Sequence, residues 1–300
     1  MTKRWLPEDL EPPLAAVREA VAAAIKEDLL PIGDLSAGLL PASAYGRAAF
    51  VARAAGVVAG TRCAEEAFAQ IDPSLQVRWL VADGGEVAPG GVIGRVNGPL
   101  RSLLTAERTA LNFLCHLSGI ATATQRYVEA AGQANGSVRV WDTRKTTPGL
   151  RALEKAAVRA GGANNHRGSL SEGVLIKDNH LVGLTIEEAV RTALERWPGR
   201  MVEVECDRIE QVQEALDAGA TLVMCDNMTP EEVHACVQLV RAHPRGVSGS
   251  VLVEASGGVN LANVAAYAVA GADVISVGAL THSVTALDIG LDLEAVTTGG

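Results

Sequence analysis

Residues 202–227, VEVECDRIEQVQEALDAGATLVMCDN, hold the pattern that decides the fold of this 300-residue chain. The apolar runs at 202–206 and 221–225 are short enough to be buried strands, and the stretch between them has helical spacing. Further strand-like runs lie at 138–141, 173–177, 251–255 and 273–278. Strands that alternate with helices in this way are typical of a parallel α/β sheet. We expect a closed or nearly closed α/β barrel, with a doubly wound sheet as the alternative.

The first hundred residues have a different pattern. Residues 14–29 have the spacing of an amphipathic helix, with charged residues beside an Ala/Val stripe. From about 46 to 104, short apolar runs are cut by glycines, which predicts strands joined by tight turns. Thr105 then opens a long helical stretch, and we expect it to cap that helix. This change of pattern predicts a domain junction around 105–118.

The composition argues against several classes of protein. A formal net charge of -9 disfavours nucleic acid and anionic membranes as partners, because both repel an acidic surface. The five cysteines form no CxxC pair, which disfavours a zinc site or a disulfide framework and favours a reducing compartment. The chain has no run of about 18 apolar residues, which a transmembrane helix would need. We expect a soluble, cytoplasmic protein.

Polar residues follow the ends of the predicted strands, where barrel enzymes carry their functional groups. One such residue alone is usually a solvated surface group. Here they occur at six strand ends, as Asp142, Arg144, Lys145, Lys177, Glu203, Glu205, Asp226, Asn227, Glu254, Ser256, Gly257, Gly258, Ser276 and Gly278. Their joint placement predicts an active site at this rim.

The distribution of charge indicates an anionic substrate. Residues 139–177 contain eight Lys or Arg and three acidic residues, a net charge of +5 in a chain of -9. His166 and Arg167 lie in this stretch, in a loop rich in Gly and Asn. Arg can bind a carboxylate through two parallel N–H groups, and Lys adds a compact positive charge. A dicarboxylate needs such a cluster.

The last strand ends suit a sugar phosphate. Backbone N–H groups at Ser256-Gly257-Gly258, and in the SVGA stretch at 276–279, can bind a phosphate. Glu205 and Asp226 are expected on adjacent strands that face this region. Their carboxylates could accept ribose hydroxyls, help to hold a magnesium pyrophosphate, or stabilise positive charge at C1 of a sugar.

The chain resembles the quinolinate phosphoribosyltransferase family, also called carboxylating nicotinate-nucleotide pyrophosphorylase. The shared strings, in order, are DTRKTTPGLR, NNHR, LIKDNH, VEVEC, MCDNM, EASGGV and ISVGALTHS. The upstream stretches EDLLPIGDLS and LLTAERTALNFLCHLSGIATAT are similar too, so the resemblance covers nearly the whole chain. Two departures are small: GDLS stands where GDLT is frequent, and SEG where SDG or GDA is frequent.

The resemblance implies an incomplete α/β barrel of about seven strands over 118–300, preceded by an α/β-sandwich domain over 1–117. The strand that our pattern lacks would fall near 160–165. The implied activity joins quinolinate to the phosphoribosyl group of phosphoribosyl pyrophosphate, with decarboxylation to nicotinate mononucleotide in NAD biosynthesis. Mg²⁺ would accompany the pyrophosphate, and the enzyme would be a homodimer with shared active sites.

The resemblance also assigns the residues of the site. Those implied around quinolinate are Arg108, which would reach into the partner's site, with Arg144, Lys145, His166, Arg167 and Lys177. Those implied around the phosphoribosyl group are Lys177, Glu205, Asp226, Ser256, Gly257, Gly258, Gly278 and Ala279. The expected catalytic residues are Lys145, Glu205 and Asp226, of which the two carboxylates would also lie at the metal.

Three other functions are open at this point. A related transferase of the same fold could use a different aromatic acid, although the full basic set favours a dicarboxylate. A barrel that only senses phosphorylated ligands would not need Glu205 and Asp226 beside the phosphate loop. A lipoyl-like carrier in the first half would need a lysine at the turn 83–85, which reads Asp-Gly-Gly.

Overall fold

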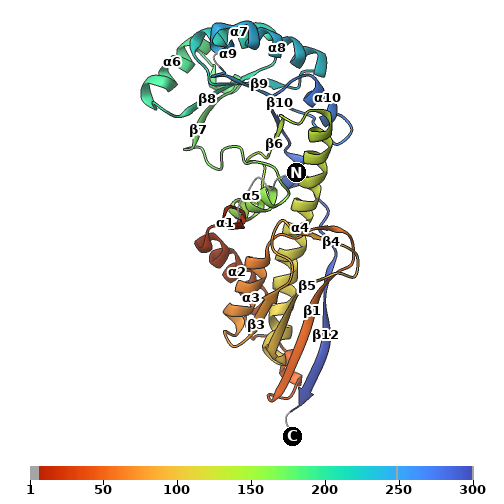
Figure 1. The fold of residues 1–300 in the computed structure, drawn as a ribbon. Coiled ribbons are helices and arrows are strands. Elements are labelled where there is room, and N and C mark those ends of the chain that lie inside the picture. Colours follow the sequence, from red (N-terminus) through yellow and green to blue (C-terminus); the bar gives the residue numbers. More distant parts are fainter. Residues whose placement is uncertain (1–6, 248, 299–300) are drawn as a thin grey trace. The chain divides into compact units, whose positions relative to one another are not determined.

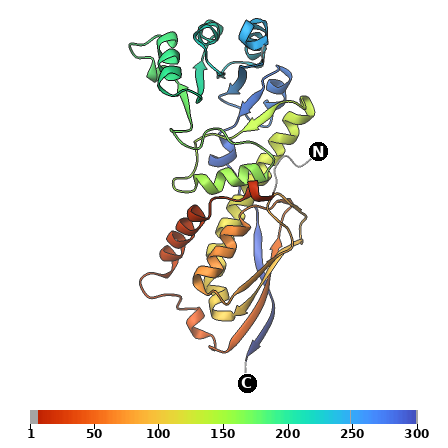
Figure 2. The same cartoon turned by 60° about the vertical axis from the view of Figure 1, so that its left-hand side comes forward.

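The computed structural model describes residues 7–247 and 249–298 and divides the chain into two compact units (Figures 1 and 2). The first unit contains residues up to 125, residues 146–162 and those from 280 onwards. The second contains residues 126–145 and 163–279. The chain thus returns to the first unit twice, at residues 146–162 and from residue 280 onwards. A return of this kind depends on distant contacts and has no local sequence pattern.

The second unit is built on a parallel sheet with the strand order β6-β11-β10-β9-β8-β7. Its strands are β6 (Arg139–Trp141), β7 (Gly173–Ile176), β8 (Met201–Cys206), β9 (Leu222–Asp226), β10 (Leu252–Ser256) and β11 (Val274–Ser276). The six predicted strands are therefore confirmed. From β7 to β11 each strand lies beside the next in the sequence, without the reversal of order that a doubly wound sheet requires.

The sheet curves without closing, as Figure 1 shows. Beyond β6, one parallel bridge joins Trp141 to Asn164, at the place where a seventh strand was expected. Among the described residues, β7 has no strand on its outer side. The predicted fold class, an incomplete parallel α/β barrel with a second α/β domain, is confirmed, and the doubly wound alternative is wrong.

Helices cover the outer face of this sheet. They are α6 (Ile186–Arg196), α7 (Ile209–Ala218), α8 (Pro230–Ala242), α9 (Pro244–Val247) and α10 (Val264–Val269), and α11 (Ala279–His282) follows β11. Two of them begin with a capping box: the hydroxyl of Thr185 accepts the Glu188 N–H at 3.1 Å, and that of Thr229 accepts the Glu232 N–H at 3.3 Å.

The first unit is an antiparallel sheet with the strand order β12-β1-β5-β3, packed against helices. Its strands are β1 (Ala44–Ala52), β3 (Gln76–Trp79), β5 (Val92–Pro99) and β12 (Ile289–Thr298), with a separate short pair, β2 (Gly56–Val57) and β4 (Glu86–Val87). Its helices are α1 (Pro7–Leu10), α2 (Leu14–Leu29), α3 (Thr61–Ile71), α5 (Arg151–Ala160) and the part of α4 (Leu100–Ala134) up to residue 125. Phe50 and Phe68 meet edge to face in its core, with ring centroids 5.9 Å apart.

Three local expectations in the first unit need correction. Residues 61–71 form α3, where only strands and turns were expected, because Cys63, Ala64 and Phe68 bury one face of a helix. Thr105 does not cap α4, which begins at Leu100 directly after β5. The Thr105 hydroxyl donates instead to the Asp34 carboxylate at 3.0 Å. Strand β12 was not predicted, and it extends the sheet by pairing with β1.

None of the helices in the described part of the chain is long and apolar enough to cross a membrane.

Candidate active site

A cavity of about 550 Å³ lies at the carboxyl ends of the strands in the second unit. Its lining residues are Thr143, Arg144, Lys145, His166, Arg167, Leu175, Lys177, Glu205, Met224, Asp226, Asn227, Glu254, Ser256, Gly257, Gly258 and Ser276. They come from β7 to β11 and from the loops after β6 and α5, so residues far apart in the sequence converge on one space. This is the place where parallel barrels carry their functional groups.

The cavity brings together most of the predicted site residues. Those that line it are Arg144, Lys145, His166, Arg167, Lys177, Glu205, Asp226, Ser256, Gly257 and Gly258. Arg108, Gly278 and Ala279 do not line it. Arg108 is exposed on α4 in the first unit, and Gly278 lies between the end of β11 and the start of α11 at Ala279.

Basic side chains form one wall of the cavity. Lys177 makes an ion pair with Glu205, and Nη1 of Arg167 donates to the carbonyl oxygen of Gly173 at 2.9 Å. Burial lowers the pKa of Arg167, and the neighbouring Arg144 guanidinium lowers it further. Two guanidiniums held this close oppose each other's charge, and an anion bound between them would relieve that opposition.

Within the same lining, Asn227 holds the Asp226 carboxylate. The Asn227 side-chain amide donates to Oδ2 of Asp226 at 2.7 Å, and its backbone N–H donates to the carbonyl oxygen of Ser256 at 2.9 Å. Its φ of 54° is the only positive φ at a non-glycine residue within the described ranges. Strained backbone of this kind concentrates at functional sites. Asn227 was among the polar residues expected at the rim, but it had been given no role.

The turn after β10 needs its glycines. Gly257 and Gly258 have φ values of 86° and 62°. A Cβ atom at Gly257 would also lie 2.3 Å from Oδ1 of Asn227, so no larger residue fits there without rearrangement. Glycines let the backbone approach a ligand closely, which suits the predicted phosphate contact.

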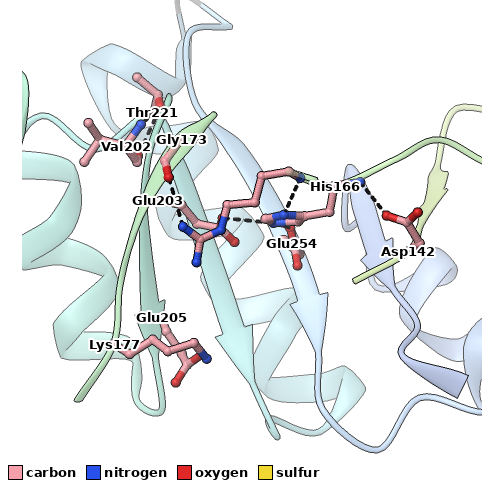
Figure 3. Close-up of polar contacts among 10 residues, drawn as sticks. Asp142, His166, Gly173, Lys177, Val202, Glu203, Glu205, Thr221 and Glu254 are labelled. Atoms are coloured by element: carbon pink, nitrogen blue, oxygen red, sulfur yellow. Dashed lines mark hydrogen bonds and ion pairs between the residues drawn. The ribbon is translucent and has the colours of Figure 1, made fainter. Parts of the chain in front are cut away.

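A buried aspartate fixes the loop that carries the histidine. Asp142 is fully buried, with Oδ1 accepting the His166 N–H at 2.8 Å and Oδ2 accepting from the Asn165 side chain at 2.7 Å (Figure 3). Asp142 had been noted among the charged strand ends without a role. Its hydrogen bonds tie the residues after α5 to the end of β6.

Two glutamates, both 0% exposed, lie beside the His166 ring. Nε2 of His166 is 2.9 Å from a carboxylate oxygen of Glu203 and 3.6 Å from one of Glu254 (Figure 3). Burial raises the pKa of Glu203 to about 8, against the opposing effect of Arg167. Burial also raises the pKa of Glu254 to about 8, and the proximity of Glu203 adds to that shift. Both glutamates were among the polar residues expected at the rim, and Glu203 was expected on the same side of its strand as Glu205, but neither had been given a role.

The models of one protein family match the chain almost end to end. The N-terminal domain of quinolinate phosphoribosyl transferase matches residues 34–118, and its C-terminal domain matches residues 120–292. This chain belongs to the quinolinate phosphoribosyltransferase family. The predicted family is thus confirmed, and with it the enzyme class, because curated relatives bear the name of a carboxylating pyrophosphorylase.

Members of the quinolinate phosphoribosyltransferase family from distant organisms are similar over nearly their full length. The nicotinate-nucleotide pyrophosphorylase [carboxylating] of Mycobacterium leprae is 41% identical over 286 residues, which cover 93% of this chain and 97% of that protein. The Homo sapiens protein of the same name is 41% identical over 261 residues, 86% of either chain. The solved nicotinate-nucleotide pyrophosphorylase of Francisella tularensis has a TM-score of 0.89 at 35% identity, covering 95% of this chain and 99% of its own.

Proposed function

We propose that this protein transfers the phosphoribosyl group of phosphoribosyl pyrophosphate to quinolinate, with decarboxylation, giving nicotinate mononucleotide, pyrophosphate and CO₂ for NAD biosynthesis. The observation that carries the proposal is a single cavity that brings a basic cluster, two carboxylates and a glycine turn together. Membership of the quinolinate phosphoribosyltransferase family supports the same reaction.

The basic wall would bind quinolinate. Its two adjacent carboxylates need at least two cationic partners, and Arg144, Arg167 and Lys177 line one cavity with Lys145. A substrate with a single carboxylate would leave part of this positive charge uncompensated. The charge of the wall therefore favours pyridine-2,3-dicarboxylate over nicotinate.

The carboxylates and the glycine turn would bind the phosphoribosyl group. Backbone N–H groups at Ser256, Gly257 and Gly258 suit the 5-phosphate. Glu205 and Asp226 end neighbouring strands and offer carboxylate oxygens, which are the donors that Mg²⁺ takes, so they would hold it there with the pyrophosphate. Bound there, Mg²⁺ would neutralise charge on the leaving pyrophosphate. Lys177 is paired with Oε2 of Glu205, which leaves Oε1 as the oxygen that would bind the metal.

The reaction would proceed in two steps. The pyridine nitrogen forms a bond to C1 of the ribose while the bond from C1 to the pyrophosphate oxygen breaks, and Glu205 and Asp226 stabilise the positive charge that develops. The product is a pyridinium, which stabilises the electron pair left at C2 when the bond to the 2-carboxylate breaks. The Lys145 ammonium then supplies the proton that C2 takes up.

We further propose a cytoplasmic homodimer. All five cysteines are free, which suits a reducing compartment. Arg108 is exposed on α4 of the first unit, as a residue that enters the cavity of a second copy would have to be.

Replacing the proposed proton donor tests this function. Lys145→Ala should lower kcat for quinolinate at least about 100-fold, because general acid catalysis contributes about that much. Lys26→Ala, which removes an exposed lysine from α2, is the control and should keep full activity. Nicotinate mononucleotide formed per unit time is the measurement. Equal rates for the two variants would refute the role of Lys145.

A further inference from the structure

Two buried glutamates are unexplained by the proposed reaction. Glu203 on β8 and Glu254 on β10 flank β9, and both are 0% exposed. None of their four carboxyl oxygens makes a hydrogen bond of normal geometry within the described ranges. Buried polar atoms nearly always have such partners, so an exception indicates either strain or a role in function. Glu254 lines the cavity, whereas Glu203 does not.

The contacts of His166 show what the two carboxyls face. Nδ1 of the ring accepts the backbone N–H of Arg167 at 2.8 Å. A nitrogen that accepts a hydrogen bond carries no proton, so the proton of the neutral ring is on Nε2. Nε2 is the atom that lies 2.9 Å from Glu203 and 3.6 Å from Glu254 (Figure 3).

A metal site is the other reading of this cluster, since the three ligand-type atoms lie within 4.8 Å of one another. The tautomer argues against it, because a protonated Nε2 has no lone pair to offer a cation. The surroundings argue against it too. The positive charges of Arg167 and Lys177 favour the ionised form of Glu203 and lower its pKa, as a bound cation would.

The same contacts connect the glutamates to the basic wall of the cavity. Arg167 follows His166 directly, and its backbone N–H is the donor to the ring. Its guanidinium donates to the carbonyl oxygen of Gly173 and is close enough to Glu203 for the two opposite charges to interact. A rotation of the ring would therefore move the backbone that carries Arg167.

We propose that Glu203 and Glu254 are positioning residues of the quinolinate site. Their carboxyl oxygens lie 2.9 and 3.6 Å from Nε2 of His166, and this electrostatic contact holds the ring, and with it the adjoining Arg167, in the orientation that binds the substrate carboxylates. This inference rests on the proposed function. A buried carboxyl without normal hydrogen bonds lowers the free energy of unfolding. A role in substrate binding explains why the protein contains two of them despite that cost.

Paired substitutions at Glu203 separate positioning from packing. Glu203→Met keeps the length of the side chain but removes the acceptor, and Glu203→Gln keeps one acceptor oxygen. We expect Glu203→Met to raise KM for quinolinate at least about tenfold, with a smaller change in KM for phosphoribosyl pyrophosphate. Glu203→Gln should recover most of the loss. Tm should stay the same or rise in both variants, because a poorly satisfied buried carboxyl has been removed.

The outer helices of the second unit offer a control. Oδ1 of Asp217 on α7 lies 3.2 Å from Nε2 of His243, and neither residue lines the cavity. Asp217→Asn should leave KM for quinolinate within about twofold of the original value, because it alters a carboxylate–histidine pair outside the cavity lining. An unchanged KM in Glu203→Met would overturn the proposal. So would a lowered Tm with equal rises in both KM values, since that result describes a packing role.

An NMR measurement tests the proposal without any turnover. In ¹⁵N-labelled protein, His166 should show the Nε2–H tautomer, and Glu203→Met should change the ¹⁵N shifts of that ring. A His166→Gln variant assigns the signals. A proton on Nδ1 in the unaltered protein would overturn the inference. If the unaltered protein makes no product from quinolinate, the proposed function fails, and the ring signals still decide whether the glutamates hold His166.

Discussion

Gly257 and Asn227 show how closely two single residues constrain each other beside the cavity. The side-chain amide of Asn227 donates to the Asp226 carboxylate. In this orientation, Oδ1 of Asn227 would lie only 2.3 Å from a Cβ atom at position 257. The positive φ of Gly257 excludes most side chains independently. The two residues therefore fix the turn and the carboxylate together.

Gly257→Ala should be much more destabilising than an alanine in an open left-handed turn. Gly183 is the comparison, because its φ is 79° and nothing lies within 4 Å of its Cβ position. We expect Gly183→Ala to lower the free energy of unfolding by about 1 kcal/mol, and Gly257→Ala by at least about 2 kcal/mol. Urea unfolding measures both. Equal losses in the free energy of unfolding for the two variants would mean that the turn at Gly257 rearranges to accommodate the added methyl group.

The buried cysteines should be unreactive in the folded protein. Cys63 and Cys206 are 0% exposed, and burial raises the pKa of each thiol to about 12. Only the thiolate is nucleophilic, so iodoacetamide at pH 7 should label both at least about 100-fold more slowly than in urea. Mass spectrometry of digested samples gives the rates. Rapid labelling of Cys206 in the folded protein would contradict this account of its environment.

At the residue scale, the sequence was informative where a side chain acts through its position on a strand. Arg144, Lys145 and Lys177 could be predicted because strand ends in a barrel meet at one rim. The role of Glu203 could not be predicted, since it depends on the loop that brings His166 over β8. Asp142 is a similar case: its position was visible, but its partners in that loop were not.

At the scale of elements, the start of a helix could be predicted where its cap lies in neighbouring residues, but not where the cap comes from a distant part of the sequence. The capping boxes at Thr185 and Thr229 are written in four consecutive residues each, so they could be predicted. Helix α3 begins at Thr61, and the residue before it, Gly60, has no side chain to cap it. Its cap comes from Asp83, whose carboxylate accepts the N–H groups of Gly60 at 3.0 Å and Thr61 at 3.1 Å. That distance in sequence explains why α3 was missed.

Removing this distant cap should destabilise the first unit. Asp83→Ala leaves two backbone donors of α3 without their acceptor, and we expect a loss of about 1–2 kcal/mol in the free energy of unfolding. Thr185→Ala, which removes a cap on a surface helix of the second unit, should cost about 1 kcal/mol. Urea unfolding followed by far-ultraviolet circular dichroism measures both. An unchanged midpoint for Asp83→Ala would show that α3 does not need this cap.

At the scale of the molecule, the strand order of the second unit follows from the sequence, whereas the composition of the first does not. A repeated strand and helix has few ways to pack, so the barrel was predictable. Strand β12 pairs with β1 across most of the chain, and such pairing depends on contacts between the two ends. The same distinction holds for function. The fold alone supports many reactions, and the convergence of charges in one cavity selects among them.

The most direct test of the central claim is to incubate the purified protein with phosphoribosyl pyrophosphate, Mg²⁺ and either quinolinate or nicotinate, and to identify the products by mass. We predict nicotinate mononucleotide and CO₂ in equal amounts from quinolinate, and no product from nicotinate. A product from nicotinate, or none from quinolinate with folded protein that still binds the sugar phosphate, would contradict the assignment of this cavity to a dicarboxylate.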